Sequence, residues 1–207
     1  MGKPIIAYSI EAALKSRLFD EVMVSTDDKE IAEIARRYGA NIPFMRSEKN
    51  SDDHATTFEV IKEVVANYSE MEVDFECACC VYATVPFVNE LLLEKAFLKL
   101  KEFNLDSVFP VMAFSFPIQR ALKADANDRV SMYHHEYMLT RSQDLEPAYH
   151  DAGQFYWMNI KACLQKNKIL TDNSGSLILS ELEGQDIDNE TDWKLAELKY
   201  ELLQSFK

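Results

Sequence analysis

The sequence predicts an α/β domain in which helices cover both faces of a mostly parallel sheet. The first observation is an alternation of strand-like and helix-like apolar patterns that continues to about residue 115. The second is the run "FECACCVYA" at residues 75–83, which is apolar almost throughout, as in a strand buried on both sides. The chain has 207 residues, of which 47% are hydrophobic, so residues 1–207 can form one domain with a sizeable core.

Apolar residues spaced three and four positions apart predict the helices. The first helix begins near Pro4, and Gly39 ends the second. Asp27 and Glu30 have capping-box spacing just before that second helix. The expected helices cover residues 4–19, 29–38, 56–68, 89–103 and 190–204.

Short apolar segments between these helices predict the strands, which cover residues 21–25, 41–45, 75–83, 106–114 and 176–182. The pattern changes between about residues 116 and 150. There, the segments 119–125 and 129–135 flank the turn-rich sequence "ANDR" and predict a hairpin. We expect this region to form an inserted lobe whose aromatic surface serves as a dimer interface.

The charge and the apolar pattern exclude several classes of function. Lys and Arg number 22 and Asp and Glu 35, so the net charge of −13 argues against a nucleic-acid-binding protein. No apolar stretch is long enough for a membrane helix, and no signal peptide opens the chain. The spacing of Cys77, Cys79, Cys80 and Cys163 does not suit a zinc knuckle, and reduced thiols predict a cytoplasmic protein.

Polar clusters follow three of the predicted strands. They are "STDD" at residues 25–28, "YATVPF" at 82–87 and "DID" at 186–188. Ligands of open α/β sheets bind at the carboxyl ends of the strands, so these clusters predict a site there. The residues alone leave two readings of Asp186 and Asp188: a metal site, or a loop before the last helix with Asn189 or Thr191 as the N-cap.

Longer motifs resemble a known family. "FDEVMVSTDDKEIAEIARRYGA", "SDDHATT", "VYATVPF", "RSQDLEPAYHDAGQFYW" and "QDIDNETDWKLAELKY" together resemble the CMP-sugar synthetases that activate nonulosonic acids. The combination of "RSQD" and "HDAGQFYW" is the most specific part, and the similarity runs from Gly2 nearly to the C-terminus. The resemblance implies a Rossmann-like nucleotide-diphospho-sugar transferase fold and a homodimer.

The same resemblance implies a reaction and a set of site residues. Members transfer CMP from CTP to a nine-carbon α-keto acid sugar, release pyrophosphate and need Mg²⁺. Pseudaminic acid is the expected sugar here, used for surface or flagellar glycans. Asp186 and Asp188 match the metal carboxylates. The implied nucleotide-binding residues are Arg46, Thr57, Asp27 and Thr84, and the implied sugar-binding residues are Arg141, Gln143, Asp151, Gln154 and Tyr156.

The start of the chain departs from the family pattern. The family's first strand and its basic, glycine-rich phosphate loop precede the element "GKPIIAYSIEAAL" and are not found here. We therefore expect weak CTP binding and low turnover. Three readings stay open: a pseudaminic acid enzyme, an enzyme for legionaminic or N-acylneuraminic acid, and a non-catalytic partner that forms dimers.

Overall fold

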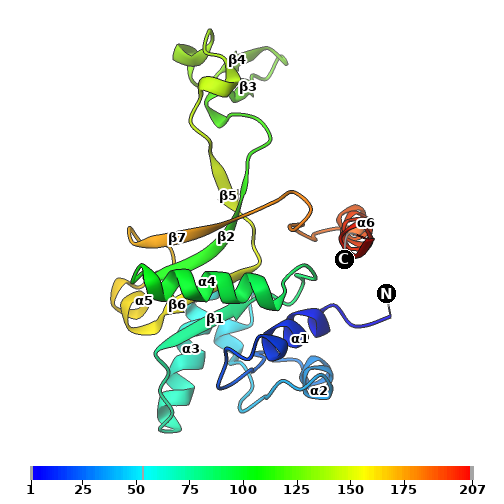
Figure 1. Cartoon of the computed structure of the whole chain (residues 1–207), viewed down its shortest axis with the longest axis vertical. Coiled ribbons are helices and arrows are strands. Elements are labelled where there is room, and N and C mark those ends of the chain that lie inside the picture. The colour runs from blue at the N-terminus through cyan, green and yellow to red at the C-terminus, as the bar shows by residue number, and fades with distance from the viewer. Residues whose placement is uncertain (1, 53, 206–207) are drawn as a thin grey trace.

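The computed structural model describes residues 2–52 and 54–205. Its centre is a sheet flanked by helices (Figure 1). The strands lie in the order β1-β6-β2-β5, and β7 pairs with β2 as well. Their bounds are β1 Cys77–Val81, β2 Ser107–Ala113, β5 Tyr149–Asp151, β6 Phe155–Asn159 and β7 Ser174–Leu179.

The α/β prediction is confirmed, with one correction to the sheet. Among the described ladders only that of β2 with β7 is parallel, because β6 runs against both β1 and β2, and β5 runs against β2. After β2 the chain leaves the sheet, forms the segment 114–148 and returns as β5 and β6 beside β2. No helix crosses over between them, so β5 and β6 must run antiparallel to β2. β1, β2 and β7 still point the same way, and their carboxyl ends share one edge.

Helices cover both faces of this sheet. Their bounds are α1 Ile6–Ser16, α2 Lys29–Arg37, α3 Thr57–Glu70, α4 Glu90–Glu102, α5 Ile160–Lys166 and α6 Glu190–Ser205. Short 3₁₀ turns occupy Glu48–Asn50, Ile118–Arg120, His135–Tyr137 and Ser142–Asp144. The sequence did not predict α5, whose seven residues are too few for a clear amphipathic pattern.

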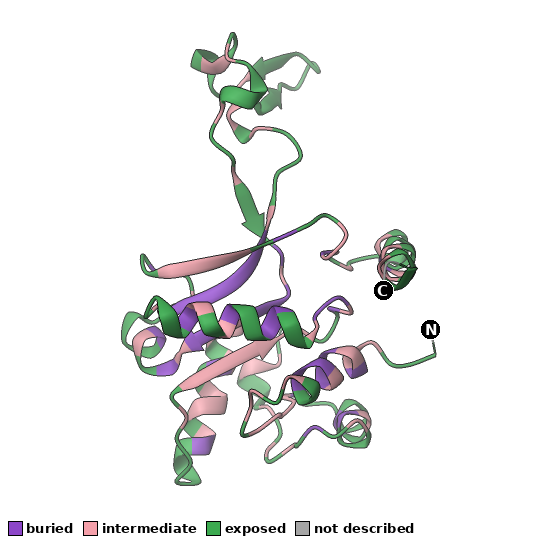
Figure 2. Cartoon of the chain, viewed as in Figure 1, coloured by how far each residue is buried: buried purple, intermediate pink, exposed green. Residues whose placement is uncertain are grey.

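Alternate residues of β6 build the two halves of the core. Phe155 and Trp157 pack with Leu93 of α4 and Val108 of β2, whereas Met158 packs with Ile61 of α3 and with α5. The indole N–H of Trp157 donates to the Leu93 carbonyl at 3.0 Å, so this buried polar group is satisfied. Figure 2 shows the buried residues gathered along β2, β6 and α4.

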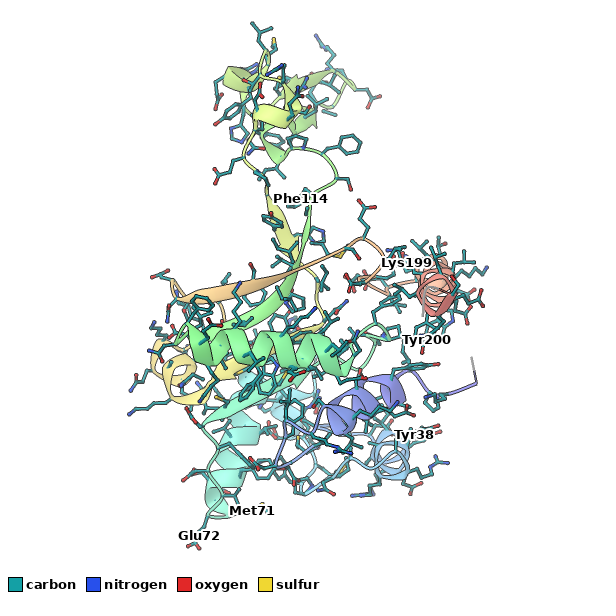
Figure 3. All side chains as sticks on the ribbon, in the orientation of Figure 1. Tyr38, Met71, Glu72, Phe114, Lys199 and Tyr200 are labelled. Carbon is teal, nitrogen blue, oxygen red and sulfur yellow. The ribbon has the colours of Figure 1, made fainter. Side chains whose placement is uncertain are left out.

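A lobe made of residues 114–149 projects from the end of β2 and β5 (Figure 1). It contains the antiparallel hairpin of β3 (Leu122–Ala124) and β4 (Val130–Met132). Asp125 closes the hairpin turn, because its carboxylate accepts the backbone N–H groups of Asn127 and Arg129 at 2.8 and 3.0 Å. Nearly all of the lobe is exposed (Figure 2). At its base the Phe114 ring packs edge-on against His150 (Figure 3).

Three local predictions were wrong. The expected strands at 21–25 and 41–45 do not form, and among the described residues their β-pairing is limited to one parallel bridge between Met23 and Asn41. β1 is half-buried along its whole length, although its apolar run predicted full burial. The capping box at Asp27 does not form: Asp28 is the N-cap of α2 and accepts the N–H groups of Glu30 and Ile31. α2 begins one residue later than that box requires.

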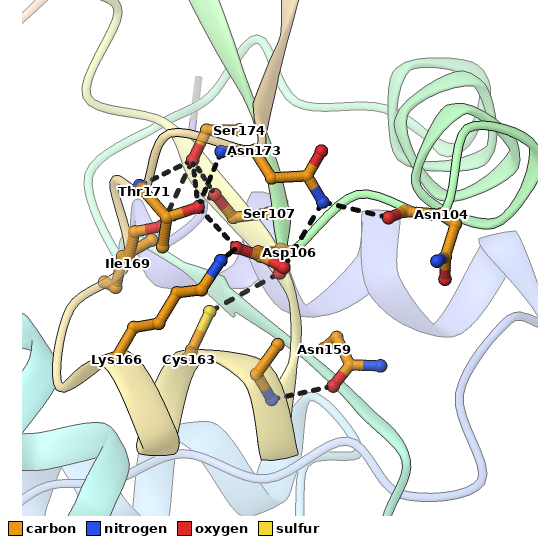
Figure 4. Close-up of polar contacts among 11 residues, drawn as sticks. Asn104, Asp106, Ser107, Asn159, Cys163, Lys166, Ile169, Thr171, Asn173 and Ser174 are labelled. Carbon is orange, nitrogen blue, oxygen red and sulfur yellow. Dashed lines mark hydrogen bonds and ion pairs between the residues drawn. The ribbon is translucent and has the colours of Figure 1, made fainter.

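A polar cluster at the amino end of β2 ties the loop before β7 to the sheet (Figure 4). Asp106 is buried, and one of its oxygens accepts from both Lys166 and Thr171 at 2.5 Å. The Ser107 and Ser174 hydroxyls lie 2.7 Å apart beside it. The cluster lies at the edge opposite the carboxyl ends of β1, β2 and β7.

Candidate functional site

Arg46 lies beside the end of the extended segment 22–26. Its backbone N–H donates to the Thr26 carbonyl at 2.9 Å, and its Nε donates to the Ser25 hydroxyl at 3.0 Å. The guanidinium also donates to the Ser25 carbonyl. Arg46 is half-buried and lines a cavity of about 1460 Å³. These contacts hold a cation at the cavity wall, where it can meet a polar or anionic ligand.

Thr57 lies on the same cavity. It is the first residue of α3, which opens with a capping box formed by Thr56 and Glu59. The Thr57 hydroxyl is 2.7 Å from the hydroxyl of Tyr82, which directly follows β1 and also lines the cavity. The structure thus brings Arg46 and Thr57 to one cavity, as the expected nucleotide site requires.

The sequence reasoning missed Tyr82 as a site residue. The signal was present, because Tyr82 is the first polar side chain after a continuously apolar strand. Thr84, chosen from the same segment, is exposed and is not among the residues that line the cavity. Asp27 is also exposed, and its neighbour Asp28 is committed to capping α2.

Asp151, Gln154 and Tyr156 meet where β5 turns into β6. The carboxylate of Asp151 accepts the Gly153 N–H and the Tyr156 hydroxyl, both at 2.8 Å. Burial, and then the hydrogen bond to Asp151, raise the pKa of the Tyr156 hydroxyl above its ordinary range, so it stays a neutral donor. The rings of Tyr156 and Tyr82 lie 5.5 Å apart, so this group adjoins the Thr57 wall of the cavity.

Gln154 is 1% exposed and has one free acceptor. Its amide nitrogen donates to the Glu183 carbonyl at 2.5 Å. Its Oε1 is buried and has no hydrogen-bond partner among the residues that the structure describes. A buried amide oxygen without a partner costs about 1–3 kcal/mol, so this atom is placed to accept from a water or a ligand.

Arg141 and Gln143 lie on the lobe and are exposed. The guanidinium of Arg141 forms a two-pronged pair with Asp144, at 2.7 and 3.1 Å. They belong to the part of the chain that projects from the sheet (Figure 1), whereas Asp151 ends β5 in the sheet itself.

Asp186 and Asp188 lie in the loop between β7 and α6. Asn189 accepts the N–H groups of Thr191 and Asp192 at 2.9 and 3.1 Å and so serves as the helix cap. The two carboxylates are exposed and take no part in that cap. Ile187, between them, shares a small cavity with Pro86 of the "YATVPF" segment. On α6, Lys199 donates to the Gly184 carbonyl at 2.8 Å and ties the start of this loop to the helix (Figure 3).

The donor set at Asp186 and Asp188 fits a hydrated Mg²⁺ better than a metal enclosed by protein. No cluster of three His, Cys, Asp or Glu side chains that could hold a metal occurs in the described part of the chain. Mg²⁺ usually keeps several waters and uses one or two carboxylates together with substrate phosphates. Asp186 and Asp188 follow the carboxyl end of β7 and offer two exposed carboxylates of this kind, but neither is among the residues that line the cavity of Arg46 and Thr57.

The thiols of β1 do not suit nucleophilic chemistry. Burial raises the pKa of Cys80 to about 11 and raises that of Cys79 as well. All four cysteines are free thiols. A protonated thiol is a weak nucleophile, so these side chains act as small apolar residues. Within the described residues, no helix is long and apolar enough to cross a membrane.

Comparisons with known proteins agree with this geometry. The family model described as cytidylyltransferase matches residues 1–187. The pseudaminic acid cytidylyltransferase of Campylobacter jejuni is 39% identical over 202 residues, which are 98% of this chain and 87% of that protein. The CMP-N,N'-diacetyllegionaminic acid synthase of Legionella pneumophila is 30% identical over 210 residues, covering 98% of this chain and 88% of that protein.

A solved structure agrees on the fold. A CMP:2-keto-3-deoxy-manno-octonic acid synthetase, in complex with CTP, superposes with a TM-score of 0.65 at 14% identity, covering 99% of this chain and 90% of that one. The predicted nucleotide-diphospho-sugar transferase fold is therefore confirmed. With a family match over residues 1–187 and relatives at 30% and 39% identity, the chain belongs to the cytidylyltransferase family.

Proposed function

We propose that this cytidylyltransferase transfers CMP from CTP to pseudaminic acid and releases pyrophosphate, for surface or flagellar glycan synthesis. The observation that carries the proposal is the contact path from Thr57 through Tyr82 and Tyr156 to Asp151. It connects the residues expected at the nucleotide with those expected at the sugar. The similarity to the Campylobacter jejuni enzyme supports the choice of sugar.

Each residue has a role that follows from its position. Arg46 and Thr57 hold the nucleotide at the cavity wall. The free Oε1 of Gln154 accepts a hydrogen bond from the sugar. The Asp151–Tyr156 pair orients the sugar. The sugar hydroxyl then attacks the α-phosphorus, a new oxygen–phosphorus bond forms as the hydroxyl proton leaves, and the bond to the β-phosphate oxygen breaks.

Asp186 and Asp188 would hold Mg²⁺ at this site. The ion would neutralise charge on the triphosphate and on the departing pyrophosphate. A protein of net charge −13 repels a triphosphate, so the two carboxylates need a cation between them and that substrate. We also place the protein in the cytoplasm, where its four free thiols stay reduced.

The lobe supports a homodimer. Its exposed apolar side chains include Leu139, which is 94% exposed, and Phe116, which is 83% exposed. Residues 114–149 carry four basic and five acidic side chains, so the lobe is almost neutral in a strongly acidic chain. A nearly neutral apolar surface lets two copies approach without the repulsion that the rest of the molecule would cause. Such a dimer would let Arg141 and Gln143 reach the sugar site of the other copy.

A panel of acceptors tests the proposed reaction. The chain is incubated with CTP, Mg²⁺ and pseudaminic, legionaminic or N-acetylneuraminic acid, and CMP-sugar and pyrophosphate are measured. We expect pseudaminic acid to give the highest kcat/KM, by about tenfold or more, because a site that hydrogen-bonds one set of substituents rejects another. A preference for either of the other acids would support the second reading of the sequence. Bound CTP without product from any acid would support a non-catalytic role.

The metal role has its own test. Asp188→Ala should lower kcat by about 10²–10³, because it removes electrostatic support at the transferring group, and it should raise the Mg²⁺ concentration that gives half-maximal rate. The control is Glu94→Ala, which removes an exposed carboxylate from α4 and should change neither quantity. An Asp188→Ala protein with normal turnover and normal Mg²⁺ dependence would rule the metal role out.

A further inference from the structure

Glu63 of α3 holds the segment that follows Arg46. One carboxylate oxygen of Glu63 accepts the Ser47 backbone N–H at 2.7 Å, and the other accepts the Ser47 hydroxyl at 2.8 Å. That second oxygen also accepts the side-chain amide of Asn50. A single carboxylate therefore binds both the residue next to Arg46 and the end of the short 3₁₀ turn behind it. We call this arrangement of Glu63, Ser47 and Asn50 the clamp.

The segment that follows Arg46 is also closed on itself. The Ser51 hydroxyl donates to the Ser47 carbonyl at 2.8 Å, and the Asn50 N–H donates to the same carbonyl at 3.1 Å. On its other side, Arg46 is bound through its backbone N–H to the Thr26 carbonyl at 2.9 Å. The arginine therefore lies between two fixed points, and the clamp is one of them.

The carboxylate of the clamp is ionised at neutral pH. Burial alone would raise the pKa of Glu63, but the hydrogen bonds from Asn50 and Ser47 outweigh it and lower the pKa below the ordinary 4.5. The positive charge of Arg46 acts in the same direction. Hydrogen bonds to an ionised acceptor are stronger than those to a neutral one, so the clamp is firmer than three bonds to an amide would be.

Glu63 acts from outside the cavity. Thr57 begins α3 and lines the cavity, and Glu63 follows about 9 Å further along the helix axis. That step corresponds to about one and two-thirds turns, so the two side chains leave different faces of the helix. Glu63 is half-buried and is not among the residues that line the cavity. One helix thus carries a cavity hydroxyl and the anchor for the cavity's arginine.

Two effects of Glu63 on a bound nucleotide oppose each other. As a negative charge near Arg46, in a chain of net charge −13, Glu63 repels a triphosphate. As part of the clamp, it fixes Arg46 before the nucleotide arrives, so less conformational freedom is lost on binding. Because Glu63 does not line the cavity and salt screens charges across solvent, we expect the second effect to be larger.

We propose that Glu63 is a positioning residue for the nucleotide: its carboxylate holds Arg46, through Ser47 and Asn50, in place to bind CTP together with Thr57. This inference rests on the proposed nucleotide role of Arg46. Sequence patterning did not single out Glu63, because its two partners lie 16 and 13 residues away along the chain.

Calorimetric titration with CTP tests the proposal on the unmodified protein, Glu63→Ala, Arg46→Ala and the double variant. We expect Glu63→Ala to weaken CTP binding by about tenfold, within the range for residues of one hydrogen-bond network. In the Arg46→Ala background the same substitution should change the affinity by less than about twofold, because the arginine that Glu63 positions is gone. If Glu63 acted through its charge alone, Glu63→Ala would instead tighten CTP binding.

Two further variants and a second readout complete the test. Glu63→Gln keeps an oxygen that can accept the Ser47 N–H, so it should lose less CTP affinity than Glu63→Ala. Glu70→Ala removes an exposed carboxylate from the same helix and should leave binding unchanged. The Arg46 amide, which donates to Thr26, should exchange its hydrogen about tenfold faster in Glu63→Ala and at the normal rate in Glu70→Ala.

The outcomes separate this inference from the proposed function. If Arg46→Ala weakens CTP binding but Glu63→Ala does not, the positioning role is overturned and the role of Arg46 stands. Equal losses from Glu63→Ala with and without Arg46 would also overturn it. If Arg46→Ala has no effect, both roles are wrong. Where CTP binding is too weak to measure, an unchanged exchange rate of the Arg46 amide in Glu63→Ala overturns the proposal, and Glu63→Gln replaces that variant if it does not fold.

Discussion

Asp106 shows how one buried carboxylate can hold an edge of the sheet (Figure 4). The hydrogen bond from Lys166, and then that from Thr171, lower its pKa below the ordinary 3.8. A lowered pKa in the folded state means that the stabilisation is complete above pH 3.8 and is lost as the pH falls through the folded value. The contribution should therefore disappear in acid.

Asp106→Asn tests this contribution. The variant keeps the shape but loses the charge, and should lower the free energy of unfolding at pH 7 by about 1–3 kcal/mol. Lys166 is partly exposed, so the lower end of that range is expected. Urea unfolding at pH 7 and pH 3 measures the difference from the unmodified protein, which should narrow at pH 3. A difference in unfolding free energy of equal size at both pH values would contradict the assignment. The control is Asp172→Asn, which changes an exposed neighbour and should not alter the unfolding free energy.

Thr57 and Tyr82 should act as a unit in nucleotide binding. Their hydroxyls are 2.7 Å apart on the cavity wall, so removing either one leaves the other without its partner. Thr57→Val and Tyr82→Phe should each weaken CTP binding, and the double variant should be weaker by less than the sum, with a coupling of about 0.5–3 kcal/mol. Calorimetric titration of the four proteins measures this. If the two losses in binding free energy simply add, the hydroxyls bind the nucleotide independently. If neither variant weakens CTP binding, they do not bind it at all.

At the scale of elements, the sequence predicted what local patterning controls. The helices at residues 29–38, 56–68 and 89–103 formed because each has an apolar stripe and a clear start signal. β6 and its antiparallel place between β1 and β2 could not be predicted, because that pairing depends on where the lobe returns the chain. The half-burial of β1 depends on its position at the edge of the sheet beside the cavity, which no local pattern records.

The candidate site also contains some residues that the sequence predicted and others that it did not. Arg46 and Thr57 came from a family resemblance, and the structure brings both to one cavity. The position of Tyr82 after a strand was visible in the sequence, but its pairing with Thr57, 25 residues away along the chain, was not. The free oxygen of Gln154 is visible only when burial and hydrogen bonds are both known.

The start of α2 gives an element-scale prediction. Asp28→Ala should lower the free energy of unfolding by about 1 kcal/mol, because the carboxylate satisfies two otherwise unpaired N–H groups of the first turn. Asp27→Ala is the matched control, with an equal change of charge next to the cap, and should stay within about 0.5 kcal/mol of the unmodified protein. Equal losses in the two variants, measured by urea unfolding, would mean that charge near the helix end matters and the cap does not.

At the scale of the whole molecule, the lobe is the surface through which we propose that two copies meet. The exposed leucine and phenylalanine of the lobe leave apolar surface in contact with water, which does not stabilise a monomer. The −13 charge of the whole chain opposes association everywhere except across a nearly neutral surface. If two lobes pair, Arg141 and Gln143 leave solvent and come within reach of another copy's sheet. Dimer formation and sugar binding would then be coupled.

Leu139→Asp tests that coupling. It puts a charge at the most exposed apolar position of the lobe and should shift the protein from dimer to monomer at micromolar concentration, because burying an unpaired carboxylate in an apolar interface is costly. Sedimentation velocity measures the mass, and the control is Leu98→Asp, which adds the same charge at an exposed leucine of α4. The monomeric variant should also bind the sugar less tightly, with KM for the sugar rising more than KM for CTP. If Leu139→Asp stays dimeric, the interface lies elsewhere, and if it becomes a monomer with an unchanged KM for the sugar, Arg141 and Gln143 do not serve a neighbouring site.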